Sequence, residues 1–157
     1  MTDTGIPRLL KKIAFLVGSW DVVLEVKPDP GADWVKSAAT SRFEVVLDGA
    51  AIRQTIEGYM GGQRFLGLGY FCYSRMTGKW QHSWIDNLAA LISTYEGDFI
   101  DDTWVLIGEE RGPQGSSFQV RLTWKSIGPN TFDWLLETSP DSQNWWPVMK
   151  MAYSRKG

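Results

Sequence analysis

The chain has 157 residues, a net charge of −2 and a single cysteine. This length suits one domain covering residues 1–157. The weak net charge offers no basic surface for nucleic acid. Cys72 alone cannot form an internal disulfide, and the absence of disulfides fits a cytoplasmic protein. No apolar run approaches the roughly 20 residues of a membrane span, and residues 1–5 do not resemble a signal peptide.

Nine tryptophans are the unusual feature of the composition. An indole buries a large area, yet its N–H group needs a hydrogen-bond partner. We therefore expect several of the tryptophans to line a cavity or its rim rather than to fill a close-packed core.

The first predicted element is a short helix that leads directly into a strand. Helical spacing is shared by Leu9, Leu10, Ile13, Leu16 and Val17, with Pro7 near the first turn. Gly18 is expected to end this helix, since glycine is favoured just past a helix end. Over residues 20–27 apolar and polar residues alternate, which predicts a half-buried strand that begins with Trp20 on its inner face.

Turn signals such as Asp48-Gly49 and Gly61-Gly62 divide the rest of the chain into further strands. The predicted ranges are 35–47, 52–57, 65–73, 79–86, 91–99, 103–111, 117–126, 131–138 and 145–155. Their even spacing and short loops predict an all-β fold, an up-and-down antiparallel barrel of about ten strands with a short N-terminal helix. Closure into a barrel removes the exposed strand edges.

Alternation also predicts which side chains face the barrel interior. In the range 65–73 we assign Tyr70 to the inner face, and in 103–107, where both faces are apolar, we favour Trp104 and Leu106. Glu109 and Glu110 are interpreted as a solvated approach to a turn. The candidate ligand-binding residues are Gln54, Tyr70, Trp84, Trp104, Trp124, Trp134, Met149 and Tyr153. Such a lining suits a flat, hydrophobic ligand with one or two polar groups.

Short motifs in a fixed order give the chain a family resemblance. They are Leu16-Val17-Gly18-Ser19-Trp20, Pro30-Gly31, Gly67-Leu68-Gly69-Tyr70, Trp84-Ile85-Asp86, Tyr95-Glu96-Gly97 and Tyr153-Ser154-Arg155. Together they resemble a lipocalin-like bacterial family of unknown function within the calycin superfamily. The resemblance implies a barrel in which Arg155 covers the Trp20 indole at one end by a cation–π contact. It does not imply an activity, because this fold hosts carriers, sensors and some enzymes.

His82 is the only histidine, and it lies between two tryptophans on a predicted inner face. It is either a hydrogen-bonded interior residue or a ligand contact or general base. Asp86, four residues further along the same strand and therefore about 13 Å away, cannot orient its imidazole. A haem site like that of the nitrobindins, which have a similar entry motif, is disfavoured because His82 lies outside any segment resembling theirs. Ligand counts predict no metal site, and we expect no cofactor.

Two hypotheses from different classes follow. The first is a carrier or sensor that binds a small hydrophobic or aromatic molecule inside a tryptophan-rich barrel. The second is a cofactor-independent enzyme, an isomerase or cyclase, that acts on a hydrophobic metabolite in the same cavity with His82 as the candidate catalytic residue. The expected partner is a small molecule, with no nucleic acid and no membrane span, and a homodimer is compatible with the sequence.

Overall fold

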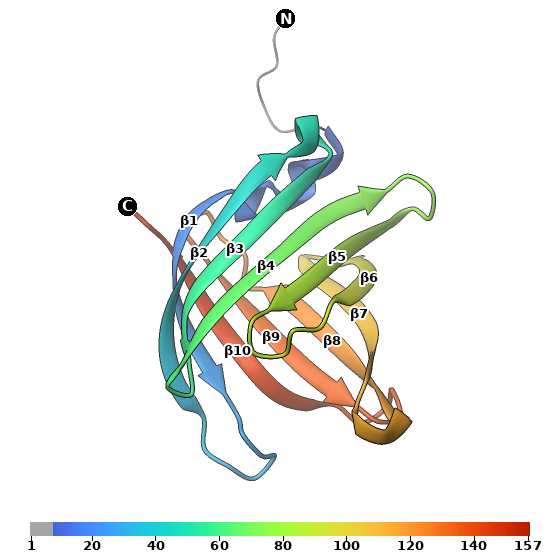
Figure 1. Ribbon diagram of the computed structural model, residues 1–157. Coiled ribbons are helices and arrows are strands. Elements are labelled where there is room, and N and C mark those ends of the chain that lie inside the picture. The colour runs from blue at the N-terminus through green and yellow to red at the C-terminus, as the bar shows by residue number, and fades with distance from the viewer. Residues whose placement is uncertain (1–7) are drawn as a thin grey trace, which may run out of the picture.

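The computed structural model describes residues 8–157 and forms one closed antiparallel barrel (Figure 1). Its ten strands are β1 Gly18–Val26, β2 Val35–Val46, β3 Ala51–Met60, β4 Gln63–Ser74, β5 Lys79–Asp86, β6 Ser93–Ile100, β7 Thr103–Arg111, β8 Ser117–Lys125, β9 Thr131–Ser139 and β10 Trp146–Arg155. Three short 3₁₀ helices, η1 Arg8–Leu16, η2 Leu47–Gly49 and η3 Pro113–Gly115, complete the fold. The predicted ten-stranded up-and-down barrel is therefore confirmed.

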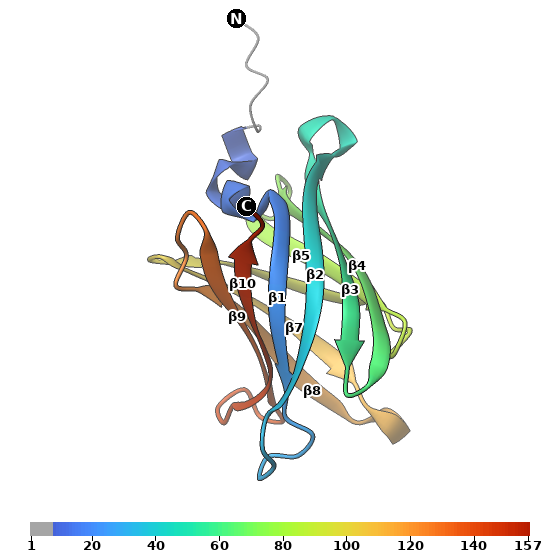
Figure 2. The same cartoon turned by 90° about the vertical axis from the view of Figure 1, so that its left-hand side faces the viewer.

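Each strand pairs with its neighbours in the sequence, and the ring closes where β1 meets β10. In that pair Trp20 lies opposite Arg155 and Val26 lies opposite Met149. As a result, η1 and the C-terminus come together above β1 and β10 (Figure 2). Within residues 8–157 there is no helix with the length and apolarity that crossing a membrane requires.

The N-terminal helix differs from the expected one in type and in its end. It is a 3₁₀ helix that stops at Leu16, and Gly18 is the first residue of β1 rather than the end of the helix. The reason lies in the spacing of Leu10, Ile13 and Leu16, which are all buried. Residues three apart lie on one line in a 3₁₀ helix, so this spacing turns all three to the barrel. Pro7, expected near the first turn, lies outside the described residues.

Arg155 and Trp20 close this end of the barrel, as the resemblance implied. The guanidinium carbon lies 4.2 Å from the centroid of the Trp20 ring. The same group donates hydrogen bonds to the carbonyls of Phe15 (3.0 Å), Val17 (2.7 Å) and Pro129 (3.1 Å). The Trp20 indole N–H donates to the Leu16 carbonyl at 2.7 Å. The carbonyls that the end of η1 leaves without partners thus accept hydrogen bonds from side chains of the first strand and the last strand.

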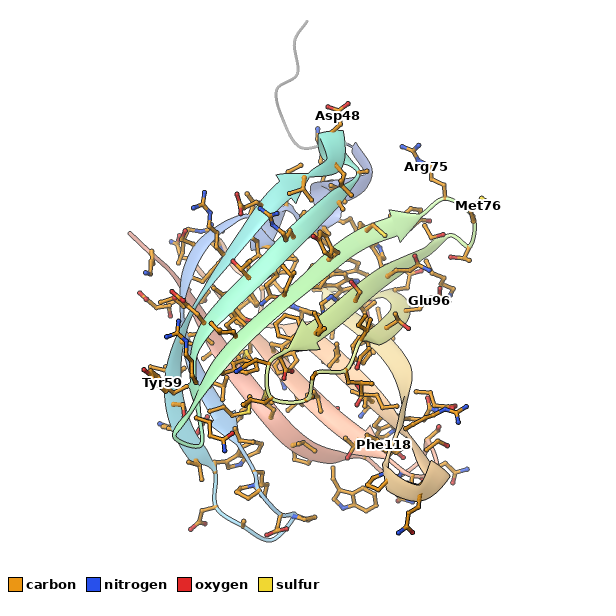
Figure 3. All side chains as sticks on the ribbon, viewed as in Figure 1. Asp48, Tyr59, Arg75, Met76, Glu96 and Phe118 are labelled. Atoms are coloured by element: carbon orange, nitrogen blue, oxygen red, sulfur yellow. The ribbon has the colours of Figure 1, made fainter. Side chains whose placement is uncertain are left out.

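Alternation identifies the inner face correctly on most strands. Trp20, Val22 and Leu24 are buried on β1, as are Ile52, Gln54 and Ile56 on β3, Trp80 and His82 on β5, Trp104 and Leu106 on β7, Val120, Leu122 and Trp124 on β8, and Met151 and Tyr153 on β10. Side chains of the opposite parity, such as Tyr59 and Glu96, point away from the barrel (Figure 3). These strands have one apolar face, and a strand has only two.

The prediction for β4 is wrong, because its inner face carries Phe65, Gly67, Gly69 and Phe71. Tyr70 lies on the outer face with 39% of its surface exposed. The reason is steric. A Cβ at Gly67 would lie 2.1 Å from the Trp84 indole, and a Cβ at Gly69 would lie 3.0 Å from the His82 ring. The two glycines make room for large side chains of β5, so the inner face of β4 looks weakly apolar in sequence.

Aromatic side chains fill the half of the barrel that η1 covers. Phe132 stacks on Tyr153 with ring centroids 4.3 Å apart and meets Trp20 edge-on at 4.8 Å. Further round the barrel, Trp104 packs against Trp124 at 4.4 Å and stacks on Phe99. Such pairs add stabilisation beyond the area that they bury. This half of the barrel is consequently a packed core, and the space for a ligand lies in the other half.

The Arg155 contacts predict a loss of stability when the side chain is removed. Arg155→Ala eliminates the cover of the Trp20 indole and leaves the Phe15 and Val17 carbonyls without their donor, so the free energy of unfolding should fall by about 1–3 kcal/mol. Urea denaturation measures this change. Lys156→Ala, which removes the next cation and its exposed pairing with Asp21, should cost at most about 0.5 kcal/mol. Equal stability of Arg155→Ala and the wild type would contradict the assignment.

Candidate ligand-binding site

The barrel holds a cavity of about 170 Å³ at the end opposite η1. Strands of a meander alternate in direction, so the starts of β4, β6 and β10 and the ends of β5, β7 and β9 all meet at this end. The cavity is lined by Gln54, Phe65, His82, Trp84, Asp86, Ala89, Leu91, Ser93, Tyr95, Glu110, Leu122, Trp124, Trp134, Leu136, Met149, Met151 and Tyr153. Its volume is close to the about 150 Å³ that holds a benzene molecule and below the roughly 300 Å³ at which drug-sized pockets begin.

Wider depressions lie on the outer surface of the barrel. One runs over β1, β2 and β3 and is lined by outward residues including Asp21, Thr40, Glu57 and Arg64. Another crosses β4 to β7 beside Tyr70 and Cys72. Both are open to solvent, so neither encloses a ligand as the interior cavity does.

His82 is held between two aromatic rings in the wall of the cavity. Phe71 stacks on the imidazole with centroids 4.0 Å apart, and Tyr95 stacks less closely at 5.7 Å. Nδ1 lies 3.1 Å from the carbonyl oxygen of Tyr70 and must donate to it. Burial lowers the pKa of His82 to about 4, although the bond to this carbonyl acts in the opposite direction. At pH 7 the ring is therefore neutral, and Nε2 carries the free lone pair.

A second polar group in the cavity is the side-chain amide of Gln54. Its Nε2 atom donates to Ser41 Oγ and to Tyr153 Oη, each at 3.1 Å. The Ser41 hydroxyl donates a hydrogen bond to the Thr55 carbonyl, and the Tyr153 hydroxyl donates one to Met151 Sδ. Both amide hydrogens are thus used inside the protein wall, and the Gln54 Oε1 acceptor has no partner among the side chains of residues 10–157 or the described backbone.

Two carboxylates form a third polar region near the mouth. Tyr95 donates its hydroxyl hydrogen to Glu110 Oε1 at 2.5 Å. Burial, and then the neighbouring Glu110, raise the pKa of Tyr95, so the phenol stays a donor. Asp86 accepts from the Trp84 indole N–H at 3.0 Å and from the backbone N–H groups of Leu88 and Ala89. Asp86 therefore fixes both an aromatic wall and the β5–β6 loop.

Most of the candidate ligand-binding residues line this cavity, namely Gln54, Trp84, Trp124, Trp134, Met149 and Tyr153. The candidate catalytic residue His82 lines it as well. Trp104 is fully buried behind the cavity, where it packs against Phe71 and Trp80. Tyr70 is on the outer face, so only its carbonyl contributes, by orienting His82.

Sequence reasoning missed Tyr95 and Glu110. The interpretation of Glu110 as a solvated residue is wrong, because its side chain lines the cavity and binds Tyr95. The signal was present, since steps of two from Trp104 and Leu106 lead through Gly108 to Glu110 on the inner face. Gly108 interrupts the apolar pattern of this face, because it has no side chain. The free space is taken by the Tyr95 ring, which lies 2.7 Å from where a Cβ of residue 108 would be.

The sequence matches the model of one protein family over nearly its whole length. The model of the family described as "Protein of unknown function (DUF1579)" matches residues 9–155. The chain belongs to this DUF1579 family. Comparison with curated proteins finds no match. The lipocalin-like resemblance noted in the sequence therefore led to a family whose activity its description leaves open.

Solved structures share the fold of this DUF1579 chain. Rv2717c from M. tuberculosis is similar with a TM-score of 0.68 and 14% identity, over 98% of this chain and 100% of that one. The S-type phycobiliprotein lyase CPES from Guillardia theta is similar with a TM-score of 0.58 and 11% identity, over 91% of this chain and 89% of that one. At these identities the similarity shows a lipocalin-like barrel fold and no more.

The buried neutral His82 predicts a pH-dependent stability. The unfolded chain takes up a proton near pH 6.5, whereas the folded protein resists it until about pH 4. Protonation of the unfolded chain therefore favours unfolding as the pH falls below 6.5. Lowering the pH from 7 to 4 should reduce the free energy of unfolding by about 3 kcal/mol through His82. His82→Gln keeps a donor for the Tyr70 carbonyl but cannot titrate, so its stability should fall less over this range. Urea denaturation at pH 7, 6, 5 and 4 compares the two proteins, and parallel profiles would disprove the effect.

Proposed function

We propose that this protein binds a small, mainly apolar molecule with one or two rings in the interior cavity and acts as a carrier or sensor. The observation that carries the proposal is the cavity of about 170 Å³ between Trp84, Trp124 and Trp134, in a barrel whose other half is solid. Aromatic walls with a few fixed polar atoms are typical of small-molecule sites. The thioethers of Met149 and Met151 let the wall adapt to the shape of the guest.

The closed barrel end supports the same function. Arg155 and η1 seal one end, so a molecule can enter only from the side where the β5–β6 loop and the starts of β4 and β10 lie. A carrier needs a cavity that keeps its shape when empty. The internal bonds of Gln54 and Tyr153 preserve that shape, because they do not depend on a ligand.

Binding can be tested with nitrobenzene, a neutral one-ring compound that quenches indole fluorescence. We expect saturable quenching, since the guest would contact Trp84, Trp124 and Trp134. Leu136→Phe, which enlarges a side chain in the cavity wall, should weaken binding at least about tenfold. Leu135→Phe makes the same change one residue away on the outer face and should bind like the wild type. Linear, unsaturable quenching, or equal affinity of the two variants, would contradict the proposal.

A second candidate function is a cofactor-independent isomerase or cyclase. One observation favours it: the neutral His82 imidazole has its Nε2 lone pair free, while Nδ1 is anchored to the Tyr70 carbonyl. Such an imidazole can accept a proton from a bound molecule and return it elsewhere, and general acid–base catalysis contributes roughly 100- to 10,000-fold. The aromatic walls would hold the reactive conformer.

His82→Gln separates this enzyme from a carrier. For any compound that the wild type transforms, the enzyme hypothesis expects kcat to fall at least about a hundredfold while the dissociation constant rises about tenfold or less. Single-turnover kinetics and calorimetry measure the two quantities separately. If no bound compound is transformed, or if kcat survives the substitution, His82 is not a catalytic base and the carrier hypothesis stands.

A further inference from the structure

The charged groups in the cavity wall are of one sign. Asp86 and Glu110 both line it, and the described lining residues include no lysine or arginine. His82 does not compensate these charges, because the buried ring is neutral at pH 7. A partly buried carboxylate without a cation is costly unless hydrogen bonds or a ligand compensate it.

Glu110 is the carboxylate with an oxygen to spare. Its Oε1 accepts from Tyr95, whereas Oε2 has no hydrogen-bond or ion-pair partner among the side chains of residues 10–157. Asp86 differs, since both of its oxygens already accept from Trp84 and the β5–β6 loop. Two glutamates of the outer face, Glu25 and Glu137, instead pair with Lys150 and Arg121.

Two further acceptors face the same space. Gln54 is 6% exposed and His82 is 5% exposed, and both line the cavity. Their donor atoms are used inside the wall, which leaves Gln54 Oε1 and His82 Nε2 without partners in the part of the chain that the structure describes. These lone pairs are free to accept hydrogen bonds, and a ligand in the cavity can supply the donors.

The aromatic wall suits a cation. The faces of indole rings attract ammonium groups, and Trp84, Trp124 and Trp134 surround the cavity. The indole N–H groups of Trp124 and Trp134 have no partner among the side chains of residues 10–157 or the described backbone. They are neutral donors, so they do not compensate the charge of Glu110.

We propose that the cavity selects apolar ring compounds that carry a single protonated amine, with the ammonium group bound to Glu110 and the ring between the tryptophans. This ligand class rests on the binding function proposed above. A cavity of about 170 Å³ limits the ligand to one or two rings. A protonated primary amine offers three hydrogen-bond donors to the unpaired acceptors of the cavity wall.

Three probes that differ mainly in charge test the proposal. They are phenethylamine, which is cationic at pH 7, the neutral 2-phenylethanol and the anionic 3-phenylpropanoate. Isothermal titration calorimetry should give the amine at least about tenfold tighter binding than the alcohol, and the carboxylate should bind most weakly. Glu110→Gln keeps the size of the side chain and an acceptor for Tyr95. It should remove the preference for the amine and leave the affinity for the alcohol within about threefold.

Glu109→Gln is the matched control, since it changes the net charge of the protein by the same amount as Glu110→Gln. Glu109 lies on the outer face, where it accepts a hydrogen bond from Gln119. It should retain the preference for the amine. If the alcohol binds as tightly as the amine, or if Glu110→Gln keeps the preference, the amine selectivity is refuted while the cavity function stands. If none of the three probes binds and nitrobenzene quenching is also unsaturable, the binding function and the amine selectivity both fail.

Discussion

The contact between Arg155 and Trp20 is the constraint on which the rest of the structure depends. One guanidinium group lies on the first inward indole and donates to carbonyls of η1, of the residue before β1 and of the β8–β9 turn. It therefore joins both ends of the chain where β1 closes on β10. Gly18 is required there, because its φ of +128° suits glycine and a Cβ would lie 2.6 Å from Arg155 Nη1. With this end sealed, ligand space can exist only at the other.

The interior is divided because the rings near η1 pack directly on one another, whereas the rings toward the other end leave a cavity between them. Rings from β1, β7, β8, β9 and β10 pack on one another in the closed half. Toward the mouth, Gly67 and Gly108 have no side chains, and the rings of Trp84 and Tyr95 occupy the space beside them. The remaining cavity is small, aromatic and acidic on one side. Those properties restrict the ligand more strongly than the barrel fold does, since similar barrels serve unrelated functions.

Local pattern predicted the barrel well because a strand has only two faces and most strands here show one apolar face. Trp20, His82 and Trp124 were assigned to the interior from alternation alone, and they are buried. The same reasoning failed for Tyr70, where the inner face holds glycines and the outer face holds Leu66 and Leu68. Hydrophobicity along one strand cannot show that a neighbouring strand supplies the side chain that fills the space.

The sequence by itself determined the strand number, the meander order and the short N-terminal helix, because these follow from periodicity and turn residues. The pairing of Arg155 with Trp20 was implied by the resemblance to lipocalin-like proteins. Only the tertiary structure decided how much of the barrel is filled and which polar atoms remain unpaired in it. The Tyr95–Glu110 bond and the orientation of His82 depend on distances between strands. Those distances are set by packing across the barrel, which no local stretch of sequence encodes.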